Sequence, residues 1–430
     1  MLAIYRGLSN VAAPLIGAYL ARRMAAGKED AARFGERLGK PSKARPPGPL
    51  AWVHGASVGE SLSALPLIER LLQERPDLHV LVTTGTVTSA AVMAERLPAR
   101  AFHQYVPVDR VPFVARFLDH WRPELALWIE SDLWPNLLVE TRRRGTPALL
   151  LNARMSPRSF ARWRRMAPLI RPLVAGFALC LAQNAGEAER LTRLGAARVK
   201  TVGNLKYAAA PLPADGRELR RLEEAMGERP RWLAASTHPG EEDIAADVHR
   251  RIASAHPGLL SLIVPRHPGR GARIAAALAA KGFSVALRSA GEAPGRGSEI
   301  YVADTMGELG LFYRLCAVTF VGGSLVPHGG HNLLEPGKLG CAVVHGPHMT
   351  NFRGIADEMD AAGAALEVRD EAALAAAVSA LLRDPERSAG LAAAAAGIAR
   401  SKAVILDNVM AEIEPFLGPA PAPEARHACA

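Results

Sequence analysis

Cysteine is scarce in this chain, and it is never spaced as a metal or redox motif would require. The 430 residues include four cysteines, Cys180, Cys316, Cys341 and Cys429, and no Cys-x-x-Cys pair. This pattern argues against a disulfide framework and against a cysteine zinc site. Three of the four lie within or beside apolar, strand-like runs, so we expect reduced, buried thiols in a cytoplasmic protein.

The N-terminus has little charge, but its apolar segment is short. From Gly7 to Ala21 the chain is almost uncharged between flanking arginines, but a bilayer crossing needs about 20 apolar residues. We therefore predict that residues 1–24 form an interfacial helix or membrane anchor with its arginines at the headgroups. Whether it spans the bilayer stays open. The alternatives are a cleaved signal peptide and a helix packed on the protein's own surface.

Signatures of nucleic-acid-binding domains are absent, although the chain is basic. It has 52 Lys plus Arg against 42 Asp plus Glu, a net charge of +10, which favours an anionic partner such as nucleic acid, a phospholipid surface or a phosphorylated substrate. Residues 152–172 concentrate arginines, including Arg154, Arg158 and Arg162, around two aromatic side chains. We interpret them as an acceptor and membrane side and predict no nucleic-acid partner. RNA binding and a plain solvated face are the alternatives.

Strand-length apolar runs alternate with helix-like segments along the whole chain, which is 49% hydrophobic. The runs are 50–53, 80–84, 125–129, 148–151 and 178–182 in the first half, and 232–235, 259–264, 284–287, 300–302, 318–321 and 342–345 in the second. Such alternation is typical of parallel sheets covered by helices on both faces. The length fits two domains of about 200 residues better than one core.

The domain boundary is predicted at a Pro- and Gly-bearing stretch without periodicity, residues 208–216. It separates an N-terminal domain at 25–207 from a C-terminal domain at 217–402. A further helix at 403–417 is expected to cross back to the first domain, and a Pro/Ala-rich tail at 418–430 is expected to be mobile.

Two glycine-rich turns follow apolar runs, one in each half of the chain. The first is His54-Gly55-Ala56-Ser57-Val58-Gly59-Glu60, and the second runs from Gly322-Gly323-Ser324 to Gly329-Gly330-His331-Asn332-Leu333-Leu334-Glu335-Pro336. Glycine at a strand-to-helix turn lets the backbone approach a ligand, and the helix start attracts an anion. The two turns predict a two-lobed enzyme with an anionic donor held between the lobes.

Three glutamates near predicted strand ends are the candidate functional carboxylates. Glu60 is either half of a capping box with Ser57 or a base that takes a proton from a hydroxyl. Glu130 is the more plausible functional group of its loop, because Asp132 is expected to cap the next helix. Glu335 is placed to accept hydrogen bonds from ribose hydroxyls, with an ordinary surface charge as the alternative.

Basic and imidazole side chains also gather near strand ends. Lys206, Arg266 and His267 are candidates for contacting a phosphate, although each alone is more often a solvated charge. His328 and His331 have a spacing compatible with chelation, but glycines lie between them. Neutral, hydrogen-bonding histidines are the preferred interpretation, and we predict no metal and no cofactor.

Together these pieces resemble the Kdo transferases, a family of glycosyltransferases that move 3-deoxy-D-manno-octulosonic acid (Kdo). The resemblance rests on the first glycine-rich turn, on Leu133-Trp134-Pro135-Asn136, on Asn152-Ala153-Arg154 and on Gly203-Asn204-Leu205-Lys206. It continues with Ser236-Thr237-His238, Gly240-Glu241-Glu242, Pro265-Arg266-His267, Asp304-Thr305-Met306-Gly307-Glu308-Leu309 and the second glycine-rich turn. The motifs keep the same order across nearly the whole chain. Two positions depart from the pattern, because Asp132 and Ala235 stand where glutamate and glycine are expected.

The resemblance implies an α/β GT-B glycosyltransferase with two Rossmann-like parallel-sheet lobes and a cleft between them. It implies that Glu60 is the general base, with Glu130 as a supporting carboxylate, and that the C-terminal lobe binds CMP-Kdo. The implied donor-binding residues are Gly59, Lys206, Ser236, Thr237, Arg266, His267, Met306, Gly307, Glu308, Gly323, Ser324, Asn332 and Glu335.

The reaction implied is an inverting transfer of Kdo from CMP-Kdo to the lipid A precursor, lipid IVA, in lipopolysaccharide synthesis. It would occur at the cytoplasmic face of the inner membrane of a Gram-negative cell, against an anionic membrane surface. The number of Kdo residues added, the acyl-chain preference and the oligomeric state stay open. A GT-B enzyme that uses a UDP-sugar, an RNA-binding protein and a peripheral membrane adaptor are the competing hypotheses.

Overall fold

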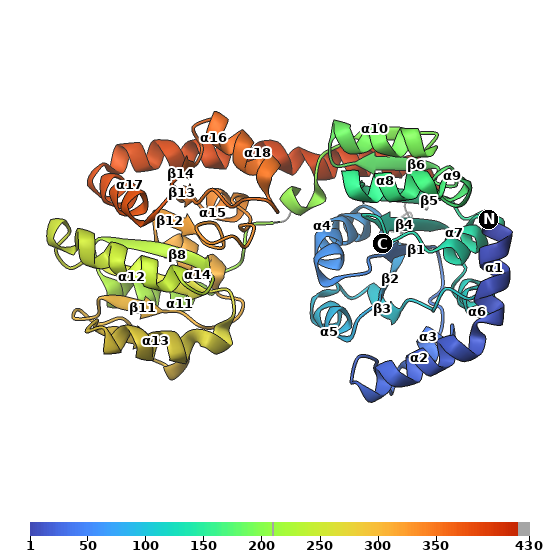
Figure 1. Cartoon of the computed structure of the whole chain (residues 1–430), viewed down its shortest axis with the longest axis horizontal. Coiled ribbons are helices and arrows are strands. Elements are labelled where there is room, and N and C mark those ends of the chain that lie inside the picture. Colours follow the sequence, from blue (N-terminus) through green and yellow to red (C-terminus); the bar gives the residue numbers. More distant parts are fainter. Residues whose placement is uncertain (209, 420–430) are drawn as a thin grey trace, which may run out of the picture. The chain divides into compact units, whose positions relative to one another are not determined.

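The computed structural model describes residues 1–208 and 210–419 and divides them into two compact units. Unit 1 holds the described residues up to 208 together with those from 403 onward, and unit 2 holds residues 210–402. Each unit is a parallel β-sheet with helices on both faces (Figure 1). The two Rossmann-like sheets predicted from the alternating apolar runs are therefore confirmed.

The sheet of unit 1 has seven parallel strands in the order β3-β2-β1-β4-β5-β6-β7. They are β1 (Leu50–His54), β2 (His79–Thr84), β3 (Ala101–Tyr105), β4 (Leu125–Ile129), β5 (Ala148–Ala153), β6 (Leu179–Ala182) and β7 (Val199–Thr201). Five of them coincide with predicted runs. The sequence did not indicate β3, which carries His103 and Gln104, or β7, a three-residue edge strand with exposed polar residues.

The sheet of unit 2 also has seven parallel strands, in the order β10-β11-β9-β8-β12-β13-β14. They are β8 (Arg231–Thr237), β9 (Leu260–Pro265), β10 (Val285–Leu287), β11 (Ile300–Val302), β12 (Val318–Val321), β13 (Ala342–His345) and β14 (Leu366–Glu367). All six predicted runs are strands. The two-residue β14 at the edge was not predicted, because a pair of residues carries no periodicity.

Helices bury apolar side chains on both faces of each sheet. The helices numbered α1 to α10 are Leu2–Val11, Ala13–Ala25, Phe34–Arg37, Val58–Glu74, Val87–Arg96, Val111–Trp121, Pro135–Arg143, Pro157–Arg165, Ala167–Val174 and Ala185–Leu194. Those numbered α11 to α18 are Gly216–Met226, Glu241–Ile252, Gly271–Ala280, Leu309–Leu315, Leu334–Lys338, Arg353–Ala361, Glu371–Arg383 and Pro385–Ile413. Short 3-10 turns η1 to η5 are Leu205–Ala208, Ala253–Ala255, Pro268–Arg270, Arg288–Ala290 and Glu414–Phe416.

Two clusters form the core of unit 1, one on each face of its sheet. One is centred on Trp52, Trp128 and Phe117, with α6, α7, α9 and α10 outside it. The other lies between the sheet and α4, and it includes Val409 and Ile413 from the end of α18. The three described cysteines, Cys180, Cys316 and Cys341, are buried and free, as predicted.

The last long helix is continuous, which corrects the prediction of a separate helical segment after Ser401. The preceding helix is separate, since α17 ends at Arg383 and α18 begins at Pro385. Within residues 1–208 and 210–419, Pro385–Phe416 is the one helical stretch long and apolar enough to cross a membrane by length and composition. Its residues Leu391 and Ile413 are buried in the cores of unit 2 and unit 1 respectively, while 17% of its most apolar 18-residue part is buried within the protein.

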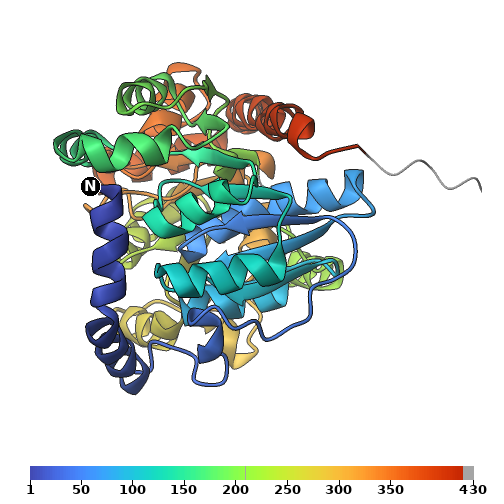
Figure 2. The ribbon, with the colours of Figure 1, turned by 90° about the vertical axis from the view of Figure 1, so that its right-hand side faces the viewer.

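The N-terminal segment forms two helices, α1 and α2, drawn in dark blue along one edge of unit 1 (Figures 1 and 2). They have 10 and 13 residues and are separated at Ala12, so each is shorter than a membrane span. On α1 the Tyr5 hydroxyl donates to Asp109 (2.9 Å), and Arg6 pairs with Glu140 (2.5 Å). The two helices carry exposed apolar residues: Ile4, Leu8, Val11, Leu15 and Tyr19. The pair therefore packs on the protein through part of its surface and leaves apolar side chains exposed.

Candidate functional site

Each sheet has one point at which the strand order reverses. The predicted site residues that lie at or after the ends of the strands flanking these points are Glu60, Glu130, Ser236, Thr237, Gly323 and Ser324. In unit 1 the reversal lies between β1 and β4, and in unit 2 between β8 and β12. Ligands of open α/β sheets bind beyond the carboxyl ends of the strands at such points, because the loops diverge there and leave space. Both glycine-rich turns follow these strands.

In unit 1, Glu60 lies in the first turn of α4 with its carboxylate folded back over the helix start. The Glu60 amide donates to Ser57 Oγ (3.3 Å), and the Ser57 hydroxyl donates to Glu60 Oε1 (3.0 Å). The Ala56 amide donates to Glu60 Oε2 (2.7 Å). The capping box considered from the sequence is thus confirmed. Capping fixes the position of the Glu60 carboxylate but leaves it able to accept further hydrogen bonds. Glu60 is only half-buried, and each oxygen keeps a further lone pair.

The surroundings of Glu60 raise the pKa of its carboxyl group. Burial raises the pKa of Glu60, and the negative charges of Glu130 and Asp132 raise it further, against the opposing hydrogen bonds from Ala56 and Ser57. Three carboxyl groups therefore act on one another at this edge of the sheet. A carboxylate with a raised pKa holds an abstracted proton more readily than an ordinary glutamate.

Glu130 follows β4 in a left-handed conformation, with φ of 67°. A non-glycine residue is uncommon there and is held only when its surroundings enforce it. Glu130 Oε1 accepts from Lys206 Nζ (2.7 Å), and Lys206 itself is one-third exposed. Lys206 lies in unit 1, whereas Arg266, the other basic candidate for contacting a phosphate, belongs to unit 2.

Asp132 does not cap α7, which corrects that prediction. The residue before α7 is Trp134, and it makes no side-chain cap bond. Asp132 instead accepts from Trp134 Nε1 (2.7 Å) and from the buried ring of His54 at Nε2 (3.3 Å). The cap comes from Asp109, in the loop after β3, which accepts from the first amides of α7. No local pattern could reveal Asp109, because 27 residues separate it from its nearest partner.

In unit 2 a residue that sequence reasoning overlooked, Glu241, holds the second glycine-rich turn. Its Oε2 accepts from the amides of His238 (3.0 Å) and Gly323 (2.6 Å), and its Oε1 accepts from the amides of Ser324 and Leu325 (3.1 Å each). Glu241 is 1% exposed. The amides of Gly323 and Ser324, expected to face the donor, therefore bind a side chain of the protein. The motif Gly240-Glu241-Glu242 was the available signal.

The strands on either side of this reversal approach so closely that Gly322 cannot be replaced by a larger residue. A Cβ there would lie 2.8 Å from the Ser236 carbonyl oxygen and 2.9 Å from the Thr237 Cα. Ser236 has φ of 57°, and Thr237 donates from its hydroxyl to Glu242 (2.9 Å), which pairs with Arg270 through two hydrogen bonds. Thr237 and Ser324 are fully buried, so their side chains support the backbone of the site and are not exposed to a ligand.

A histidine cluster lies against this turn. His238 and His331 share a hydrogen bond between their Nε2 atoms (3.0 Å), and His328 lies 3.6 Å from His238 between ring centroids. Burial, together with the neighbouring histidines and the charge of Arg266, lowers the pKa of His238 and of His331 to about 4. These rings are therefore uncharged at neutral pH, as predicted. Arg266 and His267, just beyond β9, are exposed.

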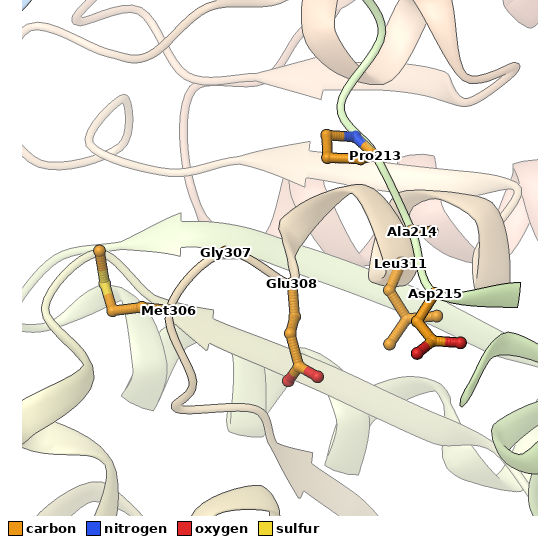
Figure 3. A pocket seen from close by; sticks show the side chains of 7 residues that line it. All are labelled: Pro213, Ala214, Asp215, Met306, Gly307, Glu308 and Leu311. Carbon is orange, nitrogen blue, oxygen red and sulfur yellow. The ribbon is translucent and has the colours of Figure 1, made fainter. Parts of the chain in front are cut away.

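The turn Met306-Gly307-Glu308 lines a pocket of about 210 Å³ in unit 2. Figure 3 shows this turn and the start of α14 beside the segment from Pro213 to Asp215. Glu308 makes two hydrogen bonds with Arg288 (2.6 and 3.0 Å), and this ion pair lowers the pKa of Glu308. Met306 is 78% exposed. Its apolar side chain is free to cover a flat ring, while Glu308 is already partnered.

Glu335 lies in the first turn of α15 and is half-buried. Its Oε1 accepts from Asn332 Nδ2 (3.3 Å), while Asn332 Oδ1 accepts from the Leu334 amide (3.1 Å). Burial raises the pKa of Glu335. Its second oxygen has no hydrogen bond within the described part of the chain, so this carboxylate can still accept from hydroxyl groups.

The arginines predicted at the acceptor side are all exposed. Arg154 follows β5, and Arg158 and Arg162 lie on α8, which has no buried residue. Phe160 and Trp163 pack inward against the core of unit 1, so the arginines point outward. Gly59, at the second position of α4, has open space around it. Across residues 1–208 and 210–419, no three His, Cys, Asp or Glu side chains are grouped to hold a metal ion.

Comparisons with known proteins agree with this picture. Residues 32–209 match the family model of 3-deoxy-D-manno-octulosonic-acid transferase (kdotransferase). The chain is 37% identical to a probable mitochondrial 3-deoxy-D-manno-octulosonic acid transferase of Arabidopsis thaliana, over 89% of this chain and 88% of the relative. It is 34% identical to the 3-deoxy-D-manno-octulosonic acid transferase of Haemophilus influenzae, over 96% and 98%.

Solved structures of the same fold are more distant in sequence. A glycosyltransferase from Rickettsia africae superposes with a TM-score of 0.58 at 12% identity, over 87% of this chain and all of that one. A UDP-N-acetylglucosamine 2-epimerase gives 0.56 at 13% identity, over 88% and 99%. These likenesses support the GT-B fold of two Rossmann-like lobes.

Proposed function

The chain belongs to the 3-deoxy-D-manno-octulosonic acid transferase family and is a glycosyltransferase, and we propose that it transfers Kdo from CMP-Kdo to lipid IVA with inversion. The proposed chemistry rests on the position and the pKa of the Glu60 carboxylate. Its carboxylate is fixed by Ser57 and Ala56 at the strand reversal of unit 1, and its pKa is raised. A fixed, half-exposed carboxylate with a raised pKa suits proton abstraction from a sugar hydroxyl.

In the proposed reaction Glu60 takes the proton of a hydroxyl on the acceptor. The acceptor oxygen forms a bond to the anomeric carbon of Kdo, and the bond from that carbon to the phosphate oxygen of CMP breaks. CMP leaves with the electron pair, from the face opposite the attack, so the configuration inverts. Glu130 supports the site through its ion pair with Lys206, which holds that ammonium group near the reacting sugar.

Unit 2 supplies the proposed donor contacts. Arg266 and His267 are exposed and would bind the phosphate of CMP. The free oxygen of Glu335 would accept from the ribose hydroxyls, and Met306 would cover the cytosine. Gly323, Ser324, Ser236 and Thr237 would act through the shape of the backbone. One phosphate carries so little charge that protein donors can stabilise the leaving group.

We place the reaction at the cytoplasmic face of the inner membrane. Support comes from the exposed apolar residues of α1 and α2 and from the outward arginines of α8. Apolar residues at an interface beside basic residues favour an anionic membrane surface.

The experiment is to incubate the purified protein with CMP-Kdo, generated in situ, and lipid IVA, and to count the sugars added by mass spectrometry. The proposal expects product that carries whole Kdo units, with inhibition by CMP and not by UDP. If lipid IVA stays unmodified while a UDP-sugar is consumed, the proposal is wrong.

A further inference from the structure

A large apolar cavity in unit 1 has no part in the reaction described so far. It has a volume of about 740 Å³, which is within the range of ligand pockets, about 300–1,000 Å³. Leu8, Ile16 and Leu20 of α1 and α2 line it together with Val106 to Val108, just after β3. Most of the lining surface is apolar, which suits a hydrocarbon, while Arg23, Arg37 and Asp109 add charged groups that suit the polar part of an amphipathic ligand.

The same cavity extends to the edge of the sheet where Glu60 lies. Ala56 and Asp132 line it. The Ala56 amide donates to the carboxylate of Glu60 (2.7 Å), and Asp132 raises the pKa of Glu60 by its charge. A ligand in the cavity would therefore have its apolar part between the N-terminal helices and its polar end beside the proposed base.

The two helices that line the cavity, α1 and α2, also carry exposed apolar side chains. Val11 and Leu15 are 79% and 76% exposed on the same pair of helices. An alkyl chain could pass from a lipid layer over α1 and α2 into the cavity and meet apolar atoms throughout. Transfer between two apolar surroundings avoids the cost of exposing the chain to water.

We propose that this cavity binds a fatty acyl chain of the lipid acceptor and thereby selects acylated over deacylated acceptors. The inference rests on the proposed function in one respect, namely that the acceptor is an acylated glycolipid. Each methylene withdrawn from water strengthens binding, so the cavity contributes affinity for the tail while Glu60 acts on the headgroup. A charge introduced into the cavity wall must then weaken binding of acylated acceptor alone.

The test uses the full chain without any sugar donor, so that it is independent of turnover. Binding of lipid IVA and of its fully deacylated counterpart is measured by calorimetry for Ile16→Glu, which places a carboxylate in the cavity. Ala18→Glu, an exposed position on the same helix outside the cavity lining, is the matched control. We expect Ile16→Glu to weaken binding of lipid IVA at least tenfold and to leave the deacylated compound unchanged, with Ala18→Glu altering neither.

A second pair of variants covers the case in which Ile16→Glu fails to fold. Leu8→Glu also lines the cavity, and it is 62% exposed, so its folding cost is small; Asn10→Glu, exposed on the same helix, is its control. Equal effects on acylated and deacylated acceptor, or equal effects of variant and control, overturn the inference. So does a change of oligomeric state in Ile16→Glu without loss of lipid binding, because the occupant is then a second copy of the chain.

The two proposals can fail separately. If no Kdo is transferred but lipid IVA binding depends on Ile16 as expected, the reaction is wrong and the cavity assignment stands. If Kdo is transferred and Ile16→Glu binds both acceptors like the unmodified protein, the cavity assignment is wrong and the reaction stands.

Discussion

At the scale of single residues, the sequence indicated which residues lie near strand ends, but it did not indicate which hydrogen bonds and ion pairs they make. The capping role of Glu60 was predicted correctly, because a capping box is a local pattern of four residues. Glu241 and Asp109 were missed, since each binds backbone amides from distant parts of the chain. A buried carboxylate that serves four amides has no periodic signature. For the same reason the partners of Lys206 and Glu308 could not be deduced before the fold was known.

Glu241 is expected to be a structural requirement of the donor side. In Glu241→Gln one acceptor oxygen becomes an amide that faces two backbone N–H groups, so those groups lose their partner. Unfilled buried donors cost about 1–3 kcal/mol. Urea denaturation should show this loss, and CMP should bind more weakly because the turn at Gly323 relaxes. Glu224→Gln, at an exposed position on α11, should change stability by no more than about 0.5 kcal/mol. Equal stability of the two variants would contradict this role.

At the scale of elements, apolar runs predicted eleven strands, and all eleven are present. The three that were missed are short or polar edge elements, or carry polar residues such as His103 in β3. Their pairing is decided by the neighbouring strand and not by their own composition. The helix after Ser401 was predicted as a separate segment, but α18 runs on from Pro385 because residues 386–413 contain no proline or other helix stop strong enough to end it.

The end of α18 should stabilise unit 1 through its buried side only. Ile413 is fully buried in the core cluster that also contains Leu205 and Ile68, so Ile413→Ala should cost about 2–5 kcal/mol by removing methylenes and leaving a cavity. Val404, on the same helix, is 51% exposed, and Val404→Ala should cost no more than about 0.5 kcal/mol. Chemical denaturation monitored by circular dichroism compares them. Similar losses of unfolding free energy for the two variants would show that Ile413 is not buried in the core of unit 1.

At the scale of the whole molecule, the net charge of +10 predicts salt-sensitive binding to anionic lipid. We expect sedimentation with vesicles that contain anionic lipid, reduced at 1 M salt, where the Debye length falls to about 3 Å. The double variant Arg158→Glu and Arg162→Glu should weaken this binding, because these arginines project from α8. Arg217→Glu with Arg273→Glu, which changes the net charge equally on exposed positions of unit 2, is the control. If both double variants bind alike, only the overall charge matters and α8 has no special role.

Composition, motif order and apolar alternation were thus sufficient for the fold of each unit and for the family. They were insufficient for the contacts that place functional groups, such as the left-handed backbone at Glu130 and the ion pair that it makes with Lys206. Those contacts depend on the relative positions of the strand ends, which are determined only when the seven strands have assembled into a sheet.

The most direct test of the account is the pH dependence of turnover in Glu60→Gln. The reaction needs the ionised carboxylate, so turnover of the unmodified protein should fall as the pH drops through the raised pKa of Glu60, at a higher pH than for an ordinary glutamate. Ser57→Ala removes a hydrogen bond to the charged form and should move this limb to still higher pH. Glutamine can keep the bond from Ala56, so Glu60→Gln should bind CMP normally.

The account predicts that Glu60→Gln lowers kcat on the order of a hundredfold or more and loses the acid limb of the pH profile. Turnover equal to that of the unmodified protein, with the acid limb intact, would contradict it and leave Glu60 as a helix cap alone.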